Sequence, residues 1–351
     1  MQNSTFDSYI GGGKNMKKYF LLIGACIILG SCSTPDAALT ARMMGSSSQA
    51  LLYLNCKAIS EEEIEFTFSR SVTIKKINFH PDYSVASIEN GSTVKVMLQD
   101  KTEPGKLITV DLLAEDENKN TINVLASFRG KNNRMPQLLI NELCTEYANA
   151  AAGRKSEFIE FKMQSDGNLG AMRVFIIGNT NAARETIFEF SPVEVKRGDY
   201  VVLHLRTYDL DNIDEYGTNL AESGGVNASP TARDFWIPGQ TKLFHKTAMV
   251  YVLDQDDKVL TAVMLCENPN VPWPKDYFTE TAQFLFEQGA WKSANGVTCL
   301  PSDAIPSTGT TNTRTICRDE TVPNTNSAAD WYITATSCAT PGGPNNPRRF
   351  N

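Results

Sequence analysis

Few side chains in this 351-residue chain are placed for acid–base or nucleophilic chemistry. There are three histidines, His80, His204 and His245. His204 stands in the alternating run DYVVLHLR, so we expect it on a solvated or half-buried strand face. The chain has no G-x-S-x-G element, and no serine, histidine and aspartate are set in a recognisable triad motif. The sequence therefore predicts a protein that is not an enzyme and has no catalytic residues.

Four carboxylates are close enough in sequence to suggest a metal site. Asp209, Asp211, Asp214 and Glu215 lie within TYDLDNIDEYGTN, and oxygen ligands at such spacing can hold calcium. The run departs from the calcium-loop pattern, because Ile213 takes the third ligand position and Asp214 the glycine position. We expect a solvated acidic loop, with calcium, the one cofactor suggested, kept as the alternative.

Aromatic side chains supply the candidate binding surface. Phe235 and Trp236 follow a Gly/Asn/Ser-rich stretch, and Trp273 stands between two prolines. Aromatic residues in long loops of a β-sandwich commonly form binding surfaces. An equal alternative is that Trp236 folds back to cover an open sheet edge.

Near the amino end the chain reads GGGKNMKKYFLLIGACIILGSCST. This is not a phosphate loop, because Asn15 follows Lys14 where a hydroxyl is needed and no strand precedes the glycines. From Met16 onward the order is basic, apolar and then small residues, which is the order of a secretory signal. The apolar run is shorter than the roughly 20 residues that span a bilayer.

The end of that run, Leu29-Gly30-Ser31-Cys32, resembles the lipobox of bacterial lipoproteins. The resemblance implies a signal peptide over residues 16–31 and lipidation, with palmitate, of Cys32. Cys26 fits the pattern more loosely, because processing there would leave a short apolar core. The lipid would make the membrane a partner and place the protein in a bacterial cell envelope, at the outer membrane or cell surface rather than the inner membrane.

Residues 1–15 precede the point where such a signal normally begins. Codons for three glycines and for Lys-Asn make a purine-rich message just before the Met16 codon, as in a bacterial ribosome-binding site. We interpret residues 1–15 as an extension from a mis-called start, and a cellular peptide running from Gln2 to Lys14 would contradict this.

The charge excludes a nucleic-acid footprint. The net charge is −7, and it becomes −9 without residues 1–31, because Asp7 and Lys14 cancel while Lys17 and Lys18 leave with the signal. The remaining chain has no strongly basic stretch, so we predict no nucleic-acid partner.

Six cysteines remain after the signal and the lipidated residue are set aside. An even count in an exported chain permits disulfides. Cys299, Cys317 and Cys338 lie in a polar, loop-rich tail, where one interpretation is that two of them form a disulfide bridge. The alternative, for Cys56, Cys144 and Cys266 in apolar strands, is that they are simply small buried residues.

Short alternating runs after residue 50 predict the first domain. Residues 32–49 are small and polar and are expected to form a flexible tether. Alternation then places Ile64, Phe66 and Phe68 on one strand face and Val94, Val96 and Leu98 on another, with turn formers between the runs. Residues 50–130 also resemble bacterial Ig-like domains, in FTFS, NGSTVKVML, PGKLITV and DENKN. The pattern departs at Ile108, usually aromatic, and at Lys119, usually glycine.

A longer series of motifs predicts the second domain. The elements, in order, are Ile140-Asn141-Glu142, residues 157–160, RGDYVV, residues 254–263, TRTICRD, Asp330-Trp331 and TPGGPN. This order resembles lamin-tail domains, which are Ig-like sandwiches, over residues 137–346, with an insertion at about 207–242. The insertion is similar to spirochaete lipoproteins that carry this domain. The resemblance assigns no catalytic role to the recurrent acids Glu142, Glu157 and Glu160.

The sequence thus predicts an all-β fold of two Ig-like antiparallel β-sandwiches in tandem, with an irregular C-terminal tail and one short helix in FTETAQFLFEQGAW. The expected function is that of a non-catalytic, lipid-anchored envelope protein acting in protein interaction, adhesion or scaffolding, with an unknown envelope or host protein as its partner. Two alternatives stay open: an accessory module or cryptic hydrolase of the envelope, and a calcium-dependent binding module.

Overall fold

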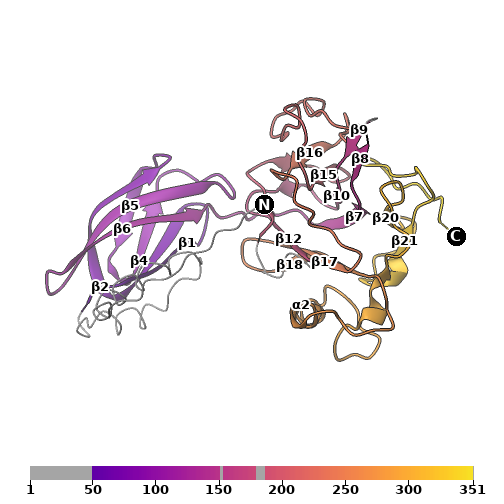
Figure 1. Cartoon of the computed structure of the whole chain (residues 1–351). Coiled ribbons are helices and arrows are strands. Elements are labelled where there is room, and N and C mark those ends of the chain that lie inside the picture. The colour runs from indigo at the N-terminus through magenta and orange to yellow at the C-terminus, as the bar shows by residue number, and fades with distance from the viewer. Residues whose placement is uncertain (1–49, 151–152, 179–185, 351) are drawn as a thin grey trace, which may run out of the picture. The chain divides into compact units, whose positions relative to one another are not determined.

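The computed structural model describes residues 50–150, 153–178 and 186–350, and these form an all-β fold, as predicted (Figure 1). The chain divides into two compact units, Met1–Leu52 and Tyr53–Asn351, and all the described strands lie in the second. The predicted extension, signal peptide, lipidation site and tether all lie outside the described residues. Within the described ranges, no helix is both long and apolar enough to cross a bilayer.

The first sheet is antiparallel and has the order β3-β4-β2-β5-β6, with β1 also paired to β2. Its strands are β1 (Tyr53–Ala58), β2 (Glu63–His80), β3 (Val85–Glu89), β4 (Gly91–Leu98), β5 (Leu107–Asp116) and β6 (Thr121–Arg129). The amino half of the long strand β2 pairs with β4, and its carboxyl half pairs with β5. The predicted inward residues of β2 and β4 are all buried, so the two-residue alternation is confirmed here: Ile64, Phe66, Phe68, Val94, Val96 and Leu98.

Two larger sheets follow. One has the order β16-β15-β10-β7-β20-β21 and the other β13-β12-β17-β18-β19. Strands of the first are β7 (Leu138–Cys144), β10 (Phe158–Met163), β15 (Tyr200–His204), β16 (Arg233–Trp236), β20 (Ile316–Arg318) and β21 (Trp331–Ile333). Strands of the second are β12 (Arg173–Ile177), β13 (Phe188–Glu189), β17 (Ala248–Leu253), β18 (Val259–Cys266) and β19 (Ile305–Pro306). All pairs are antiparallel except β15 with β16 and β18 with β19.

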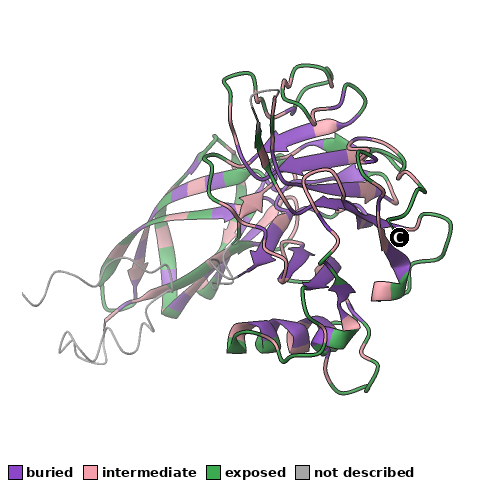
Figure 2. Ribbon diagram, turned by 45° about the vertical axis from the view of Figure 1, so that its right-hand side comes forward, coloured by how far each residue is buried: buried purple, intermediate pink, exposed green. Residues whose placement is uncertain are grey.

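Side chains from both of these sheets share one apolar core. Ile140 and Phe161 contribute from the first sheet, and Val174 and Val250 from the second. The predicted helix is present as α2 (Asp276–Glu287), which buries Phe278, Thr281, Ala282 and Leu285. Figure 2 shows the result as a buried face and an exposed face on α2, the amphipathic pattern expected of a helix on a core. Short pairs complete the fold: β8 (Ala148–Ala150) with β9 (Gly153–Lys155), and β11 (Gly167–Asn168) with β14 (Glu194–Val195).

The C-terminal tail is part of the sandwich rather than an irregular appendage. Its strands β20 and β21 extend the sheet of β7, and Ile316 and Trp331 join the core. The three cysteines proposed for bridging are buried, but all six cysteines in the described ranges are free thiols. The disulfide reading of Cys299, Cys317 and Cys338 is therefore wrong in this structure, since burial in the core accounts for these residues.

Strand β15 corrects the expectation for His204. The alternation in DYVVLHLR predicts Val201, Leu203 and Leu205 inward, and all three are buried. The opposite face is covered too, since Val202 and His204 have no exposed surface. The reason is the insertion, which returns as β16 to pair with β15 and adds Ala232 to a second cluster with Val202 and Phe158. A two-residue alternation cannot reveal a face that a distant segment covers.

Candidate functional site

The candidate site starts from two buried acids that face each other across neighbouring strands. Glu142 on β7 and Glu160 on β10 are cross-strand partners, and neither side chain is exposed. A buried carboxylate is costly unless hydrogen bonds satisfy its oxygens. Both acids belong to the motifs that resemble lamin-tail domains, so their hydrogen-bond partners show which parts of the chain these motifs bring together.

Both acids bind backbone groups of the TPGGPN segment near the C-terminus. Glu142 accepts hydrogen bonds from the Thr315 hydroxyl and, at 3.0 Å, from the Thr340 amide. Glu160 accepts one from the Gly342 amide at 2.6 Å and one from the Asn141 side chain at 2.8 Å. The segment is thus held by residues almost 200 positions earlier in the chain.

Three more motif residues complete this arrangement. The Asn345 side chain donates to the carbonyl oxygens of Asn141 and Arg318, at 3.0 and 2.9 Å. Arg318 donates to the Ile140 carbonyl at 3.0 Å, and its guanidinium lies over the Trp331 ring, 4.5 Å from the centroid. We call this set the C-terminal latch; its members are Asn141, Glu142, Glu160, Arg318, Trp331, Thr340, Gly342 and Asn345.

The electrostatics of the latch follow from burial. Burial raises the pKa of Glu142, and burial together with the neighbouring Glu142 charge raises the pKa of Glu160 well above its usual value of 4.5. Burial lowers the pKa of Arg318 to about 10, which leaves the guanidinium charged at neutral pH. One proton shared within the acid pair would relieve the repulsion between these two cross-strand carboxylates.

The third recurrent acid is also tied to the protein itself. Glu157 is fully buried and accepts hydrogen bonds from two nitrogens of Arg206, whose third nitrogen donates to the Gln240 carbonyl at 2.6 Å. Arg206 also lies over the Tyr147 ring, 3.8 Å from the centroid. Glu157 therefore fixes Arg206, and Arg206 joins the start of the insertion to its end at Gln240.

Two of the four acids proposed for calcium, Asp214 and Glu215, bind backbone groups of the insertion instead. Glu215 is buried and accepts the backbone amides of Glu222, Ser223 and Asp234, at 3.1, 3.0 and 2.9 Å. Asp214 accepts the Trp236 amide at 2.7 Å. The described residues contain no group of three or more His, Cys, Asp or Glu side chains that could hold a metal ion, so Asp209, Asp211, Asp214 and Glu215 do not converge on one.

The three aromatic residues do not form an exposed surface. Phe235 is fully buried in the core, and Trp236 is only 6% exposed. Trp273 packs partly buried against the same core and donates its indole N–H to the Cys299 carbonyl at 3.1 Å. The binding-surface prediction is corrected accordingly, because β16 pairs along the sheet edge, turns Phe235 into the core and stacks Trp236 on His204 on the opposite face.

Sequence reasoning missed one buried pair. His204 Nε2 lies 2.7 Å from Asp234 Oδ1, and the Trp236 ring stacks on the imidazole with centroids 3.8 Å apart. The two partners are 30 positions apart and meet only because β16 is parallel to β15. The sequence gives no local signal for that pairing.

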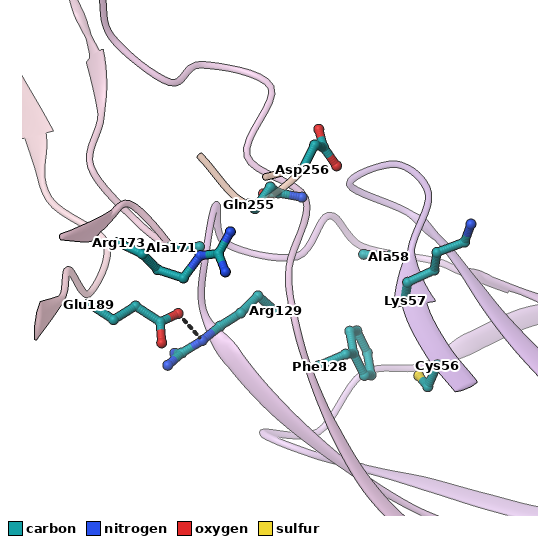
Figure 3. A pocket seen from close by; sticks show the side chains of 10 residues that line it. All are labelled: Cys56, Lys57, Ala58, Phe128, Arg129, Ala171, Arg173, Glu189, Gln255 and Asp256. Carbon is teal, nitrogen blue, oxygen red and sulfur yellow. Dashed lines mark ion pairs between the residues drawn. The ribbon is translucent and has the colours of Figure 1, made fainter. Parts of the chain in front are cut away.

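A separate pocket of about 330 Å³ is lined largely by charged side chains (Figure 3). The Arg129 guanidinium and the Glu189 carboxylate on its wall form an ion pair of 2.7 Å. Arg173 is likewise paired with Asp257 at 2.7 Å. The other charged residues of the wall are paired as well, Lys57 with Glu65 and Asp256 with Lys131. The wall therefore offers no unpaired charge to select a charged ligand.

Comparison with known proteins gives one relative and several structural likenesses. A protein of Treponema pallidum (strain Nichols), described as uncharacterized, is 26% identical over 222 residues, 60% of this chain and 54% of that protein. This chain is therefore related to a spirochaete protein, and it matches about half of that relative's length.

Among solved structures, a DUF4876 family protein from Bacteroides thetaiotaomicron aligns over 79% of this chain and 93% of its own, at 12% identity and a TM-score of 0.31. The N-terminal part of the bacterial S-layer protein SbsC aligns over 65% and 46%, at 13% identity and a TM-score of 0.24. Likeness at this level supports no argument about fold or function.

A protein-family model covers most of the two larger sheets, those that contain β7 and β12. The model TP_1001_2nd, described as a protein second domain, matches residues 136–333. Those residues include β7, β10 and Arg318 and end at β21, so they contain most of the latch. Because the match spans more than half of the chain, this protein belongs to the TP_1001_2nd family.

Proposed function

We propose that this chain is a non-catalytic, lipid-anchored protein of a bacterial cell envelope that presents an Ig-like and a lamin-tail-like sandwich for interaction with another protein. One observation carries the proposal: the stretch from Met16 to Cys32 has the basic, apolar and small-residue order of a lipoprotein signal and ends on LGSC. The relationship to a spirochaete protein agrees with a bacterial source for such a signal.

Lipid on Cys32 would supply the membrane attachment. A single acyl chain gives only marginal and reversible binding, whereas two or more hold stably. The small, polar residues 33–49 that follow would act as a flexible spacer between the lipid and the first strand. This arrangement would leave the sandwiches in the aqueous phase beside the membrane, at the outer membrane or cell surface.

A non-catalytic role is supported by how the buried acids are used. A catalytic acid or base must come within hydrogen-bond reach of its substrate. Glu142, Glu157 and Glu160 are instead fully buried and are occupied by Thr340, Arg206 and Gly342. These contacts stabilise the fold and account for the recurrent acids without a reaction.

An interaction role is supported by the insertion, which exposes several large apolar side chains. Leu210 is fully exposed, and Ile213, Tyr216 and Val226 are between 41% and 52% exposed. Single exposed apolar residues on loops are ordinary. Here, however, they lie on a segment whose backbone is held by hydrogen bonds to the carboxylates of Asp214 and Glu215. A preorganised loop binds at a lower cost in conformational entropy.

Anchoring is tested by growing cells with an alkyne-bearing palmitate analogue and detecting label on the immunoprecipitated protein. Wild type and the Cys26→Ser control should carry label, and Cys32→Ser should not. Label that persists in Cys32→Ser and disappears in Cys26→Ser would show that the lipid is on Cys26 instead. An unlabelled wild type would contradict lipid anchoring.

Interaction is tested by crosslinking on intact cells, followed by capture of the protein. Wild type should capture a reproducible partner, and a Leu210→Ser/Val226→Ser double variant should lose it at unchanged melting temperature. Trp236→Ala is unsuitable as a probe, because Trp236 is buried and its loss would perturb the fold. Reproducible capture of nothing by the wild type, in envelope and host extracts alike, would count against the interaction role.

A further inference from the structure

The insertion carries a loop tip made of two segments, residues 209–213 and 222–226, that lie side by side. The Asp211 carbonyl accepts the Gly224 amide at 2.7 Å. The Asn212 side chain donates to the Gly224 carbonyl at 3.3 Å. These bonds join the two segments, so residues that are more than ten positions apart contribute to one surface.

Three large apolar side chains of the loop tip are exposed to solvent. Leu210 is fully exposed, Ile213 is 43% exposed and Val226 is 52% exposed. Apolar side chains gathered on the surface of a soluble protein commonly mark a site of protein interaction. A partner that lies across the two segments can cover all three.

The backbone of the loop tip is fixed before any partner binds. Asn212 Oδ1 accepts the amides of Tyr208 and Asp209, at 2.9 and 3.0 Å. The buried Glu215 carboxylate accepts the Glu222 amide at 3.1 Å. Binding at a surface held in this way costs less conformational entropy than binding at a flexible loop.

The carboxylates of the loop tip are not neutralised by the protein. Asp209, Asp211 and Glu222 are exposed, and in the part of the chain that the structure describes their side chains have no ion pair or hydrogen bond. Arg154 is a basic side chain beside them; it lies over the Tyr208 ring, 5.7 Å from the centroid, and lines the same small pocket as Asp209. Three negative charges against this one positive charge leave the surface acidic.

We propose that the loop tip binds a cationic amphipathic segment of a partner protein. The apolar side chains of that segment cover the three exposed apolar residues, and its lysine or arginine side chains face the three carboxylates. Charge complementarity of this kind selects the partner and speeds its association. An anionic membrane surface or a nucleic acid is repelled by the same carboxylates. The inference rests on the proposed interaction role and adds to it the chemistry of the partner.

The test measures the binding of labelled synthetic helices to the full chain in a non-ionic detergent, by fluorescence anisotropy. The probe helix carries leucine on one face and lysine on the other. A second helix has glutamate in place of lysine, and a third has the leucines and lysines in scrambled order. We expect saturable binding of the leucine/lysine helix, weaker binding of the scrambled helix and no binding of the leucine/glutamate helix. No saturable binding of the leucine/lysine helix, or equal binding of any other helix, would overturn the proposal.

The triple variant Asp209→Asn/Asp211→Asn/Glu222→Gln removes the three charges and keeps the side-chain shapes. It should bind the leucine/lysine helix roughly 10-fold more weakly than wild type, as expected for the loss of three exposed charge pairs. Because these side chains are exposed, the melting temperature should not change. Added salt should weaken binding by the wild type more than binding by this variant.

The matched control is the triple variant Asp82→Asn/Asp100→Asn/Glu117→Gln. These three acids are also exposed and have no ion pair among the described residues, and their loss changes the net charge by the same amount. The control should bind the leucine/lysine helix like wild type. Equal binding by the two triple variants would show that only the net charge matters and would overturn the proposal.

Failure of this inference and failure of the interaction role give different results. If crosslinking on cells captures a reproducible partner and the leucine/lysine helix does not bind, the interaction role is supported and the cationic partner is wrong. If the helix binds as expected and no partner is captured from cells, the chemistry of the loop tip is supported and the interaction role is contradicted.

Discussion

The substitution Gly342→Ala tests the latch at its tightest point. Gly342 is buried, has φ of +80° and donates its amide to Glu160. A Cβ at this position would lie 2.3 Å from both the Cβ and the Oγ of Ser229. Ser229 cannot move aside cheaply, because its amide is bound to Asp234 and its Oγ contacts Thr231.

The expected cost has two parts. The left-handed backbone region costs an L-residue about 1–2 kcal/mol, and inserting a methyl group into a packed site costs about 1–3 kcal/mol more. We therefore expect Gly342→Ala to lower the free energy of unfolding by ~2–5 kcal/mol. The neighbouring Gly343→Ala is the matched control, since its nearest contact for a new Cβ is the Thr340 carbonyl oxygen at 3.8 Å. Its effect should stay within about 0.5 kcal/mol.

Urea unfolding at constant pH, followed by tryptophan fluorescence, measures both variants against wild type. The Gly342→Ala midpoint should fall clearly while Gly343→Ala matches wild type, and the slope with urea should be unchanged. Equal free energies of unfolding for the two variants would refute the reasoning. A larger loss for Gly343→Ala would refute it as well.

Three further outcomes follow from the same contacts. The pKa of Glu160 is raised well above 4.5, so the folded state holds a proton that the unfolded state releases. The free energy of unfolding should therefore fall as the pH rises above 4.5 toward the higher pKa of the folded state, and Glu160→Gln should flatten that slope. A slope unchanged by Glu160→Gln would argue against the shift. Leu210→Ser should alter the free energy of unfolding by less than about 0.5 kcal/mol, since Leu210 is fully exposed, and a larger loss in thermal unfolding would show that the side chain is packed. A chain beginning at residue 33 should show its six thiols in denaturant without a reductant, because they are free, and a count of four in an Ellman titration would reveal a disulfide.

The sequence predicted those parts of the fold that depend on local periodicity. Alternation in β2 and β4 identified the inward residues, because each face of a strand repeats every two residues. The approximately helical spacing of Phe278, Ala282, Phe284 and Leu285 indicated α2 for the same kind of reason, although Phe284 is not one of the helix's buried residues. These signals lie within a single element, so no knowledge of distant contacts was needed.

The candidate site depended on contacts that no local pattern encodes. Thr340 meets Glu142 across 198 positions and Gly342 meets Glu160 across 182. The motifs pointed to these residues but not to their roles, because a buried acid and a catalytic acid look alike in sequence. His204 was misplaced for a related reason, since the strand that covers it comes from an insertion.

We propose above all that the mature protein begins at a lipid-modified Cys32. Mass spectrometry of the protein extracted from native membranes tests it most directly. We expect an N-terminal peptide that starts at Cys32 and carries the mass of acyl chains, with no residue before Cys32. A peptide that contains Ser31 joined to an unmodified Cys32 would contradict it.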